Sequence, residues 1–309
     1  MTEASFCYSI FGLRVRSEFA LVEVPEDPSG GTFDVTIRRG PVGEADSPPG
    51  AYSVQADGTL LNLPGTARML LREGREIVID APEASDRKIR TYLLGSAFGA
   101  LLHQRGLMPL HANAIDIGGK AVAFAGHSGA GKSTLAAWFH DRGYEVLADD
   151  VCVIGWEGDM PVVQPGIPRL RLWREALEAT GRSLADYERS FEDTDKYDVP
   201  TVRRARKPLR LDKIYFLQVA SDKASGPTIS ALPGTGGVAE LVSNTYRGAY
   251  LAMIGRTGEH LMQCVRIARE VPLFRAEREW GLEGFDEQAR RLEEHAIGFG
   301  PGLASSNRP

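Results

Sequence analysis

The residues most suited to chemistry form a glycine-rich loop at 126–133, which reads Gly-His-Ser-Gly-Ala-Gly-Lys-Ser. It fits the pattern G-x-x-x-x-G-K-[ST], in which glycines let successive backbone N–H groups turn toward phosphate oxygens. Lys132 is long enough to contact β- and γ-phosphates, and the Ser133 hydroxyl can ligate Mg²⁺. The residues expected to bind a nucleotide are therefore Gly126, His127, Ser128, Gly129, Ala130, Gly131, Lys132, Ser133 and Thr134.

An acidic pair, Asp149-Asp150, follows the loop at the end of a predicted strand over 144–148. The carboxyl ends of strands are where α/β folds place their chemistry. One carboxylate could hold Mg²⁺, and the other could accept the proton of an attacking hydroxyl. Together with Lys132 and Ser133, the pair is typical of phosphoryl transfer. A solvated strand end is the alternative interpretation.

A histidine precedes the loop. His111 lies at the start of an apolar run over 110–117 that predicts a strand, and Gly118-Gly119 predicts a hairpin turn into the next one. A single histidine is often structural, but this one is close in sequence to the loop and to the acidic pair. Both a site role and a structural role stay open for it.

The elements around these residues are those that a phosphate loop requires. Residues 120–125 form a short apolar run of buried-strand length, and residues 134–142 read as a helix that Gly143 ends. Further upstream, residues 85–105 carry apolar side chains at helical spacing, with Ser85 as the N-cap and Gly106 as the stop. The sequence therefore predicts an α/β core in which strand, loop and helix follow one another.

This block resembles the catalytic core of the HPr kinase/phosphorylase family. The resemblance rests on His111, on the loop, and on the segment 142–150, which reads Arg-Gly-Tyr-Glu-Val-Leu-Ala-Asp-Asp. It implies a P-loop kinase core of the HPr kinase / phosphoenolpyruvate carboxykinase type, with ATP and Mg²⁺ as cofactors. It further implies that Asp150 is the general base, that Lys132 binds phosphates, that Ser133 and Asp149 bind the metal, and that His111 lies beside the aspartates.

The sequence departs from that family at two positions. His127 stands where the family usually has Asp, and Thr134 where bacterial HPr kinases usually have Glu. These differences argue against a phosphorylase activity and against HPr as the substrate. A narrower resemblance, which adds residues 101–111 and 164–173, is to the HPr-kinase-like proteins of bacterial peptide-tailoring clusters. It implies that a serine of a lasso-type precursor peptide is phosphorylated. A kinase for free serine and a non-catalytic regulatory nucleotide-binding protein are the alternatives.

The rest of the chain predicts a β-rich N-terminal unit at 1–84, a catalytic domain at 85–297 and a disordered tail at 298–309. Of 309 residues, 43% are hydrophobic and 25% charged, and the net charge of −5 argues against nucleic-acid binding. Three widely spaced cysteines indicate neither a zinc site nor a disulfide framework. With neither a signal segment nor an apolar run long enough for a bilayer, we expect a cytoplasmic protein without a membrane partner. The oligomeric state, monomer or homo-oligomer, stays open.

A charged segment at 190–210 allows two interpretations. Charge runs are usually solvated loops, which is the interpretation we favour here. The alternative is a lid whose arginines close over phosphate or over an acidic peptide.

Overall fold

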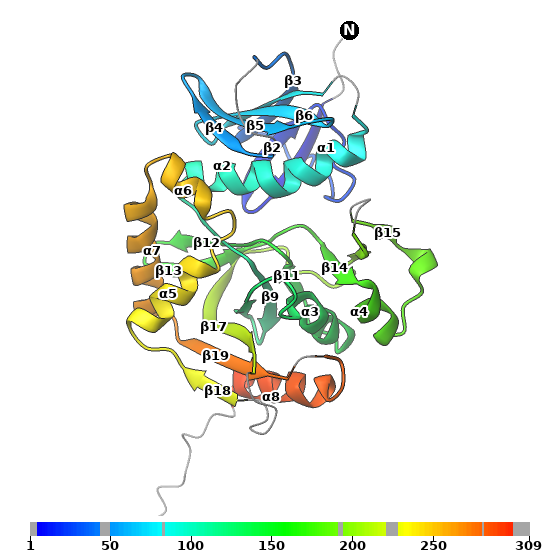
Figure 1. The fold of residues 1–309 in the computed structure, drawn as a ribbon, viewed down its shortest axis with the longest axis vertical. Helices are drawn as coiled ribbons and strands as arrows, with labels where there is room; N and C mark the ends of the chain where they lie inside the picture. The colour runs from blue at the N-terminus through cyan, green and yellow to red at the C-terminus, as the bar shows by residue number, and fades with distance from the viewer. Residues whose placement is uncertain are drawn as a thin grey trace, which may run out of the picture.

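The computed structural model describes residues 5–43, 50–81, 84–190, 194–220, 228–279 and 281–298. The disordered tail predicted from residue 298 lies outside these ranges, apart from Gly298 itself. The described chain forms three β-sheets and helices around them, so the predicted α/β class is confirmed. One sheet from the N-terminal part lies above a long helix, and the other two lie below it (Figure 1). Within the described ranges, every helix is too short or too polar to cross a membrane.

The N-terminal sheet has seven strands in the order β1-β2-β3-β7-β6-β5-β4. Pairs β2–β3 and β3–β7 are parallel and the others antiparallel, so the β-rich unit is a mixed sheet in which antiparallel pairs predominate. The strands are β1 (Phe6–Ile10), β2 (Leu13–Ser17), β3 (Val35–Arg39), β4 (Tyr52–Gln55), β5 (Gly58–Leu63), β6 (Ala67–Arg72) and β7 (Glu76–Asp80).

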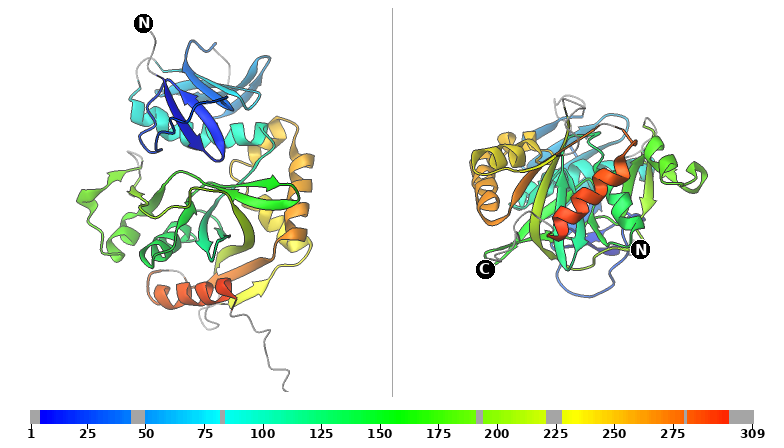
Figure 2. Two further views of the ribbon diagram at one scale, coloured as in Figure 1. Left: turned by 180° about the vertical axis from the view of Figure 1, so that it is seen from behind. Right: turned by 90° about the horizontal axis from the view of Figure 1, so that it is seen from below.

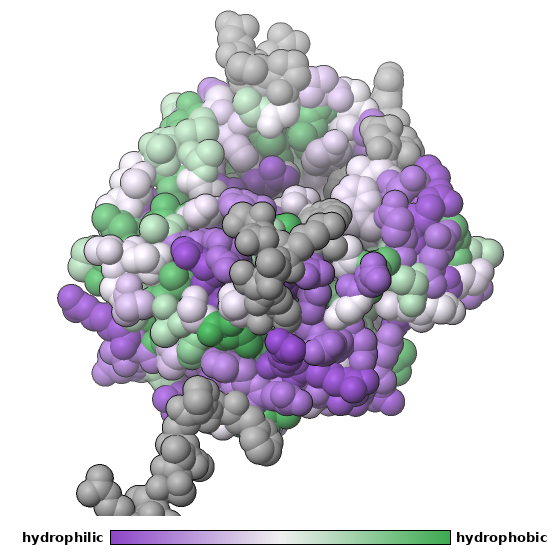
Figure 3. All heavy atoms as spheres, turned by 60° about the horizontal axis from the view of Figure 1, so that its bottom comes forward, coloured by the Kyte–Doolittle hydropathy of each residue, from purple (hydrophilic) through white to green (hydrophobic). Residues whose placement is uncertain are grey.

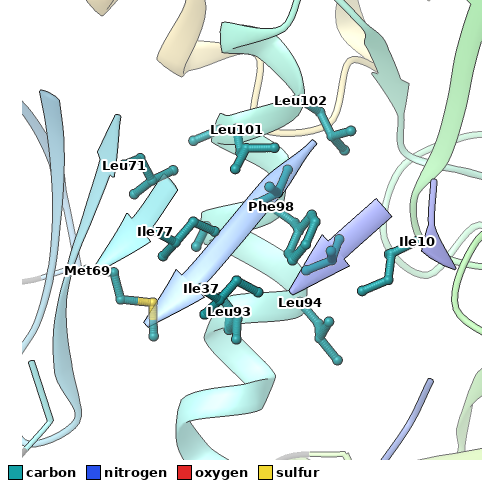
Figure 4. Close-up of a cluster of buried hydrophobic side chains, with 14 of the residues drawn as sticks. Ile10, Ile37, Met69, Leu71, Ile77, Leu93, Leu94, Phe98, Leu101 and Leu102 are labelled. Atoms are coloured by element: carbon teal, nitrogen blue, oxygen red, sulfur yellow. The ribbon is translucent and has the colours of Figure 1, made fainter. Parts of the chain in front are cut away.

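The long helix beneath this sheet consists of α1 (Asp86–Tyr92), a π-helical turn η1 (Leu93–Ala97) and α2 (Phe98–Gln104). The Ser85 hydroxyl accepts a hydrogen bond from the Lys88 N–H at 3.4 Å, which confirms the predicted cap. Leu93, Leu94, Phe98 and Leu101 point into the same apolar cluster as side chains of the sheet (Figure 4). The helix thus completes the core of the N-terminal sheet, while a domain boundary at residue 84 stays a prediction.

The second sheet has nine strands and holds the loop. Its main path is β11-β9-β10-β17-β13-β12-β8, and β19 pairs with β17 and β18. Strands β10, β17 and β19 are parallel, so their carboxyl ends lie at one edge. The strands are β8 (Met108–Leu110), β9 (Ala112–Ile117), β10 (Lys120–Ala125), β11 (Val146–Ala148), β12 (Cys152–Glu157), β13 (Met160–Gln164), β17 (Leu209–Val219), β18 (Thr228–Ala231) and β19 (Leu273–Arg278).

Helices cover both faces of this sheet. On one face, Val122 and Phe124 of β10 pack with α3 (Lys132–Asp141) and α8 (Phe285–Ile297). On the other, the alanines of β10 pack with α5 (Thr235–Ser243) and α7 (Thr257–Glu270), and α6 (Ala249–Met253) follows α5. Seen from below, α8 lies across the sheet (Figure 2). Because side chains alternate along a strand, β10 presents large residues to one layer and small ones to the other.

The third sheet, β14-β16-β15, corrects the interpretation of the charged segment. It consists of β14 (Arg169–Trp173), β15 (Glu188–Arg189) and β16 (Lys196–Pro200), with α4 (Arg174–Ala179) and the 3₁₀ turn η2 (Leu184–Asp186) between β14 and β15. Tyr197 and Val199 are buried, so the predicted solvated loop is wrong for β16. Alternation of apolar and charged residues makes one face of this strand a packing surface. On the face of the molecule shown in Figure 3, hydrophilic residues dominate the lower part of the surface.

Candidate active site

The phosphate-loop motif connects β10 to α3, as the sequence predicted. Gly126, Gly129 and Gly131 have φ values of +155°, +86° and +79°, which L side chains rarely adopt. Gly131 is also the N-cap of α3, so the positive end of the helix dipole faces the loop. The backbone therefore has the conformation and the electrostatic field that suit a bound anion.

Lys132 lies folded against this loop. Its Nζ donates hydrogen bonds to the carbonyl oxygens of Gly126 at 2.6 Å and of His127 at 3.0 Å. The side chain is buried, and burial lowers the pKa of Lys132 to about 8. An anion in the loop would restore a counter-charge to this ammonium group.

Ser133 and Asp149 are in direct contact. The Ser133 hydroxyl donates to Asp149 Oδ1 at 2.9 Å, and the Arg171 N–H donates to Asp149 Oδ2 at 2.8 Å. Asp149 is buried, and burial, assisted by the neighbouring Asp150 carboxylate, raises the pKa of Asp149 to about 6. The hydroxyl and the carboxylate lie next to each other, and both are hard oxygen ligands of the type that Mg²⁺ prefers.

These residues do not form a complete metal cage. Within the described ranges, no group of three or more His, Cys, Asp or Glu residues could hold a metal ion. Mg²⁺ commonly uses one or two protein oxygens, waters and substrate phosphates instead. Ser133 and Asp149 therefore fit a metal that arrives with a nucleotide.

Asp150 faces a different set of partners. Its Oδ2 accepts a hydrogen bond from Arg171 Nη1 at 3.0 Å, and His111 Nδ1 lies 3.4 Å from its Oδ1. Although burial alone would raise it, the pKa of Asp150 is lowered by the positive charges around it, Arg171 foremost. Its φ of +70° is unusual for a residue other than glycine. Asp150 is thus an ionised carboxylate in a strained, fixed position.

His111 lies in the short gap between β8 and β9, rather than inside the continuous strand that the sequence predicted for 110–117. Its Nδ1 is 3.1 Å from the carbonyl oxygen of Asp150, which favours the tautomer with hydrogen on Nδ1. Burial and the charge of Lys132 lower the pKa of His111, so the ring is neutral at pH 7. His111 can therefore hold the Asp150 segment in place without adding a full charge.

A single cavity of about 650 Å³ brings most of the predicted residues together. Its wall includes loop residues, His111 and Asp150, while Asp149 lies beneath it against Ser133. Gly126, His127 and Ala130 contribute backbone to the loop but do not line the cavity. The lining residues are His111, Ser128, Gly129, Gly131, Lys132, Ser133, Thr134, Asp150, Arg171, Trp173, Glu175, Ala176, Lys196, Arg278, Gly281, Leu282 and Phe285.

Sequence reasoning missed four prominent members of this wall: Arg171, Trp173, Lys196 and Arg278. Arg171 and Trp173 lie on β14, in a stretch whose alternating charged and apolar residues could have indicated a strand near the site. Lys196 belongs to the charged segment, where alternation was hidden by its high charge. Arg278 follows the loop by about 150 residues, and no local pattern connects the two.

The floor beneath the aspartate pair comes partly from the N-terminal sheet. Phe11, at the tip of the β1–β2 hairpin, has a φ of +55° and is fully buried against Phe98. Its N–H donates to the carbonyl oxygen of Pro165 at 3.1 Å. Together with Leu94, it lines a small void of about 10 Å³ against Asp149 and Asp150. The hairpin tip thus lies close to the aspartate pair.

Comparison with known proteins adds to this geometry. No family model matches the chain. The HPr kinase/phosphorylase of Chloroherpeton thalassium is 32% identical over 81 residues, which are 26% of this chain and 23% of that protein. The HPr(Ser) kinase/phosphatase structure from Coxiella burnetii aligns with 62% of this chain and 97% of its own at 12% identity and a TM-score of 0.34. The chain thus spans about a quarter of the length of this relative, and the predicted resemblance to the HPr kinase/phosphorylase family is confirmed.

Proposed function

We propose that this protein is an ATP-dependent kinase with a P-loop core, which transfers the γ-phosphoryl group to a serine hydroxyl. The observation that carries the proposal is that Lys132, Ser133 and Asp150 line one cavity of about 650 Å³. A loop for phosphates and an ionised carboxylate therefore face the same space. Phosphoryl transfer needs this combination, because its catalysis is mostly positioning and charge stabilisation.

In this proposal the loop holds the nucleotide phosphates. Backbone N–H groups of 126–133 and the ammonium group of Lys132 would contact phosphate oxygens, in place of the carbonyl contacts that Lys132 now makes. Ser133 and Asp149 would hold Mg²⁺, which when bound neutralises charge on the phosphates. Electrostatic stabilisation of this kind is often the largest single contribution to such catalysis.

Asp150 would orient the serine hydroxyl and take its proton as the oxygen attacks. Its lowered pKa keeps it ionised at neutral pH, which makes it a constant acceptor although a weak base. A weak base suffices where the transition state is loose and the proton leaves late. Arg171 at 3.0 Å and the His111 ring would fix the carboxylate in position.

For the acceptor, we propose a serine of a lasso-type precursor peptide in the cytoplasm. Support comes from the resemblance to peptide-tailoring kinases and from the cavity mouth. There Trp173 is 41% exposed, and Lys196 Nζ lies 4.9 Å from the centroid of its ring. An exposed aromatic residue beside a lysine offers an extended chain both apolar and polar contact.

Phosphoryl transfer from labelled ATP tests the proposal. Purified protein is incubated with [γ-³²P]ATP·Mg²⁺ and, in parallel, a serine-containing lasso precursor peptide, free serine or HPr, with Asp150→Asn as the negative control. We expect label on the peptide, at serine, with the wild type alone. Label on free serine only would replace the peptide by a small molecule. Binding of ATP without transfer to any acceptor would favour the regulatory nucleotide-binding protein.

A further inference from the structure

A buried arginine lies directly behind the phosphate loop, although it is distant in sequence. Arg278 is the last residue of β19, and its Nη2 donates a hydrogen bond to the carbonyl oxygen of Ala130. The guanidinium group occupies the space that a Cβ on residue 131 would need, and the φ of +79° at this position also favours glycine. The loop and Arg278 are therefore fitted to each other.

The sheet topology explains how this contact arises. Strands β10, β17 and β19 are parallel neighbours, with Ala125 beside Phe216 and Val219 beside Arg278. The carboxyl ends of all three strands thus lie at one edge, which is where the loop begins. Arg278 enters the loop cavity from the third strand and lines it together with Lys132 and Ser133.

No carboxylate of the described residues balances the charge of Arg278. Arg278 is only 9% exposed, and this burial lowers the pKa of its guanidinium group. Among the described residues, no carboxylate lies within ion-pair distance of it, whereas Arg171 pairs with Asp150 and Arg275 of the same strand pairs with Glu240. A buried cation without a counter-charge is expensive, so a site that keeps one indicates an anion that binds there.

We propose that Arg278 is a phosphate-binding residue, which contacts the polyphosphate of the bound nucleotide and stabilises charge on the transferring group. This proposal rests on the proposed function. A guanidinium has five N–H donors, and the hydrogen bond to Ala130 uses one of them. That bond holds the group in place, so that further donors can meet phosphate oxygens in a fork that lysine cannot reproduce.

The experiment compares Arg278→Met and Arg278→Lys with Arg275→Met, a control that removes a charge from the same strand outside the cavity. Calorimetric titrations with ATP, tripolyphosphate and adenosine are combined with melting temperatures of the nucleotide-free proteins. For Arg278→Met we expect ATP and tripolyphosphate to bind about 10- to 100-fold more weakly, as for a lost charge-assisted contact. Adenosine binding should not change, and the melting temperature should stay equal or rise, because an unbalanced buried charge is removed.

Further outcomes separate this proposal from its premise. We expect Arg278→Lys to recover only part of the ATP affinity, and Arg275→Met to bind ATP as the wild type does. A lower melting temperature of Arg278→Met with parallel losses for ATP and adenosine would assign Arg278 a structural role and overturn the proposal, as would unchanged ATP affinity. If the wild-type protein binds tripolyphosphate but not ATP, the kinase proposal is refuted and the phosphate-binding role of Arg278 stands. If it binds neither ligand, both proposals are refuted.

Discussion

Replacing Asp149 by asparagine should stabilise the nucleotide-free protein at neutral pH. The pKa of Asp149 is raised to about 6 by burial, from about 3.9 in an unfolded chain. One pH unit of difference corresponds to about 1.4 kcal/mol, so ionised Asp149 destabilises the folded state by about 3 kcal/mol above pH 6. An asparagine removes this charge, and its amide oxygen can still accept from the Arg171 N–H while its NH₂ faces the Ser133 hydroxyl.

The stability difference between the variant and the wild type should depend on pH in a defined direction. A carboxyl group whose pKa is higher in the folded state contributes stability below the unfolded pKa, and that stability is lost as pH rises toward the folded value. We therefore expect Asp149→Asn and wild type to be equally stable near pH 4. The difference should grow between pH 4 and 6 and reach about 3 kcal/mol, or about 6 °C in melting temperature, above pH 7.

The assay is chemical and thermal unfolding in EDTA between pH 4 and 8, with the exposed Asp159→Asn as a matched control. That control should shift stability by less than about 0.5 kcal/mol at every pH. Addition of Mg²⁺·ATP should reverse the order, because the wild type gains stability from a ligand that the variant cannot bind through the metal. A variant less stable than wild type at pH 8, or a difference that does not vary with pH, would refute the reasoning.

Three further variants test other parts of the site. Lys132→Met should bind ATP about 100-fold more weakly yet stay folded, because it removes a buried charge along with two carbonyl contacts. Unchanged ATP affinity in calorimetry would show that the lysine does not contact the phosphates. Asp150→Asn should bind ATP normally but transfer phosphate about 10²–10⁴-fold more slowly in a radiolabel assay, and a wild-type rate would exclude it as the base. Gly126→Ala should lower stability by about 1–3 kcal/mol in urea unfolding, because its Cβ would lie 2.8 Å from the Leu217 carbonyl oxygen; an unchanged midpoint would show that the loop adapts.

The local part of the site could be predicted from the sequence. Strand, loop and helix around Gly126–Ser133 are encoded by neighbouring residues, and the hairpin at Gly118-Gly119 follows from local turn chemistry. The contact between Ser133 and Asp149 also agrees with the metal ligands that the resemblance implied. Their chemical roles stay predictions until the variants are measured.

The long-range part could not be predicted. Arg171, Lys196 and Arg278 reach the cavity through strand pairings that no local pattern specifies. Helix α5 likewise ends at Ser243 and α6 begins only at Ala249, because Tyr246 and its neighbours turn to pack beside His111. Tertiary contacts of this kind override helical propensity.

The hairpin tip at Phe11 has a consequence for how the chain folds during synthesis. Its docking partner, Pro165, is made more than 150 residues later, and the apolar cluster around it also includes Tyr250, whose hydroxyl donates to Thr59 Oγ1 at 2.9 Å. At ribosomal rates of about 5–20 residues per second, these partners are missing for about 10–50 s after the hairpin emerges. The helix at 86–104 can cover part of this cluster earlier, but the hairpin tip at Phe11 lacks its Pro165 and Tyr250 partners throughout this interval. Aggregation of the nascent chain should therefore depend on chaperone supply more than on the stability of the finished protein.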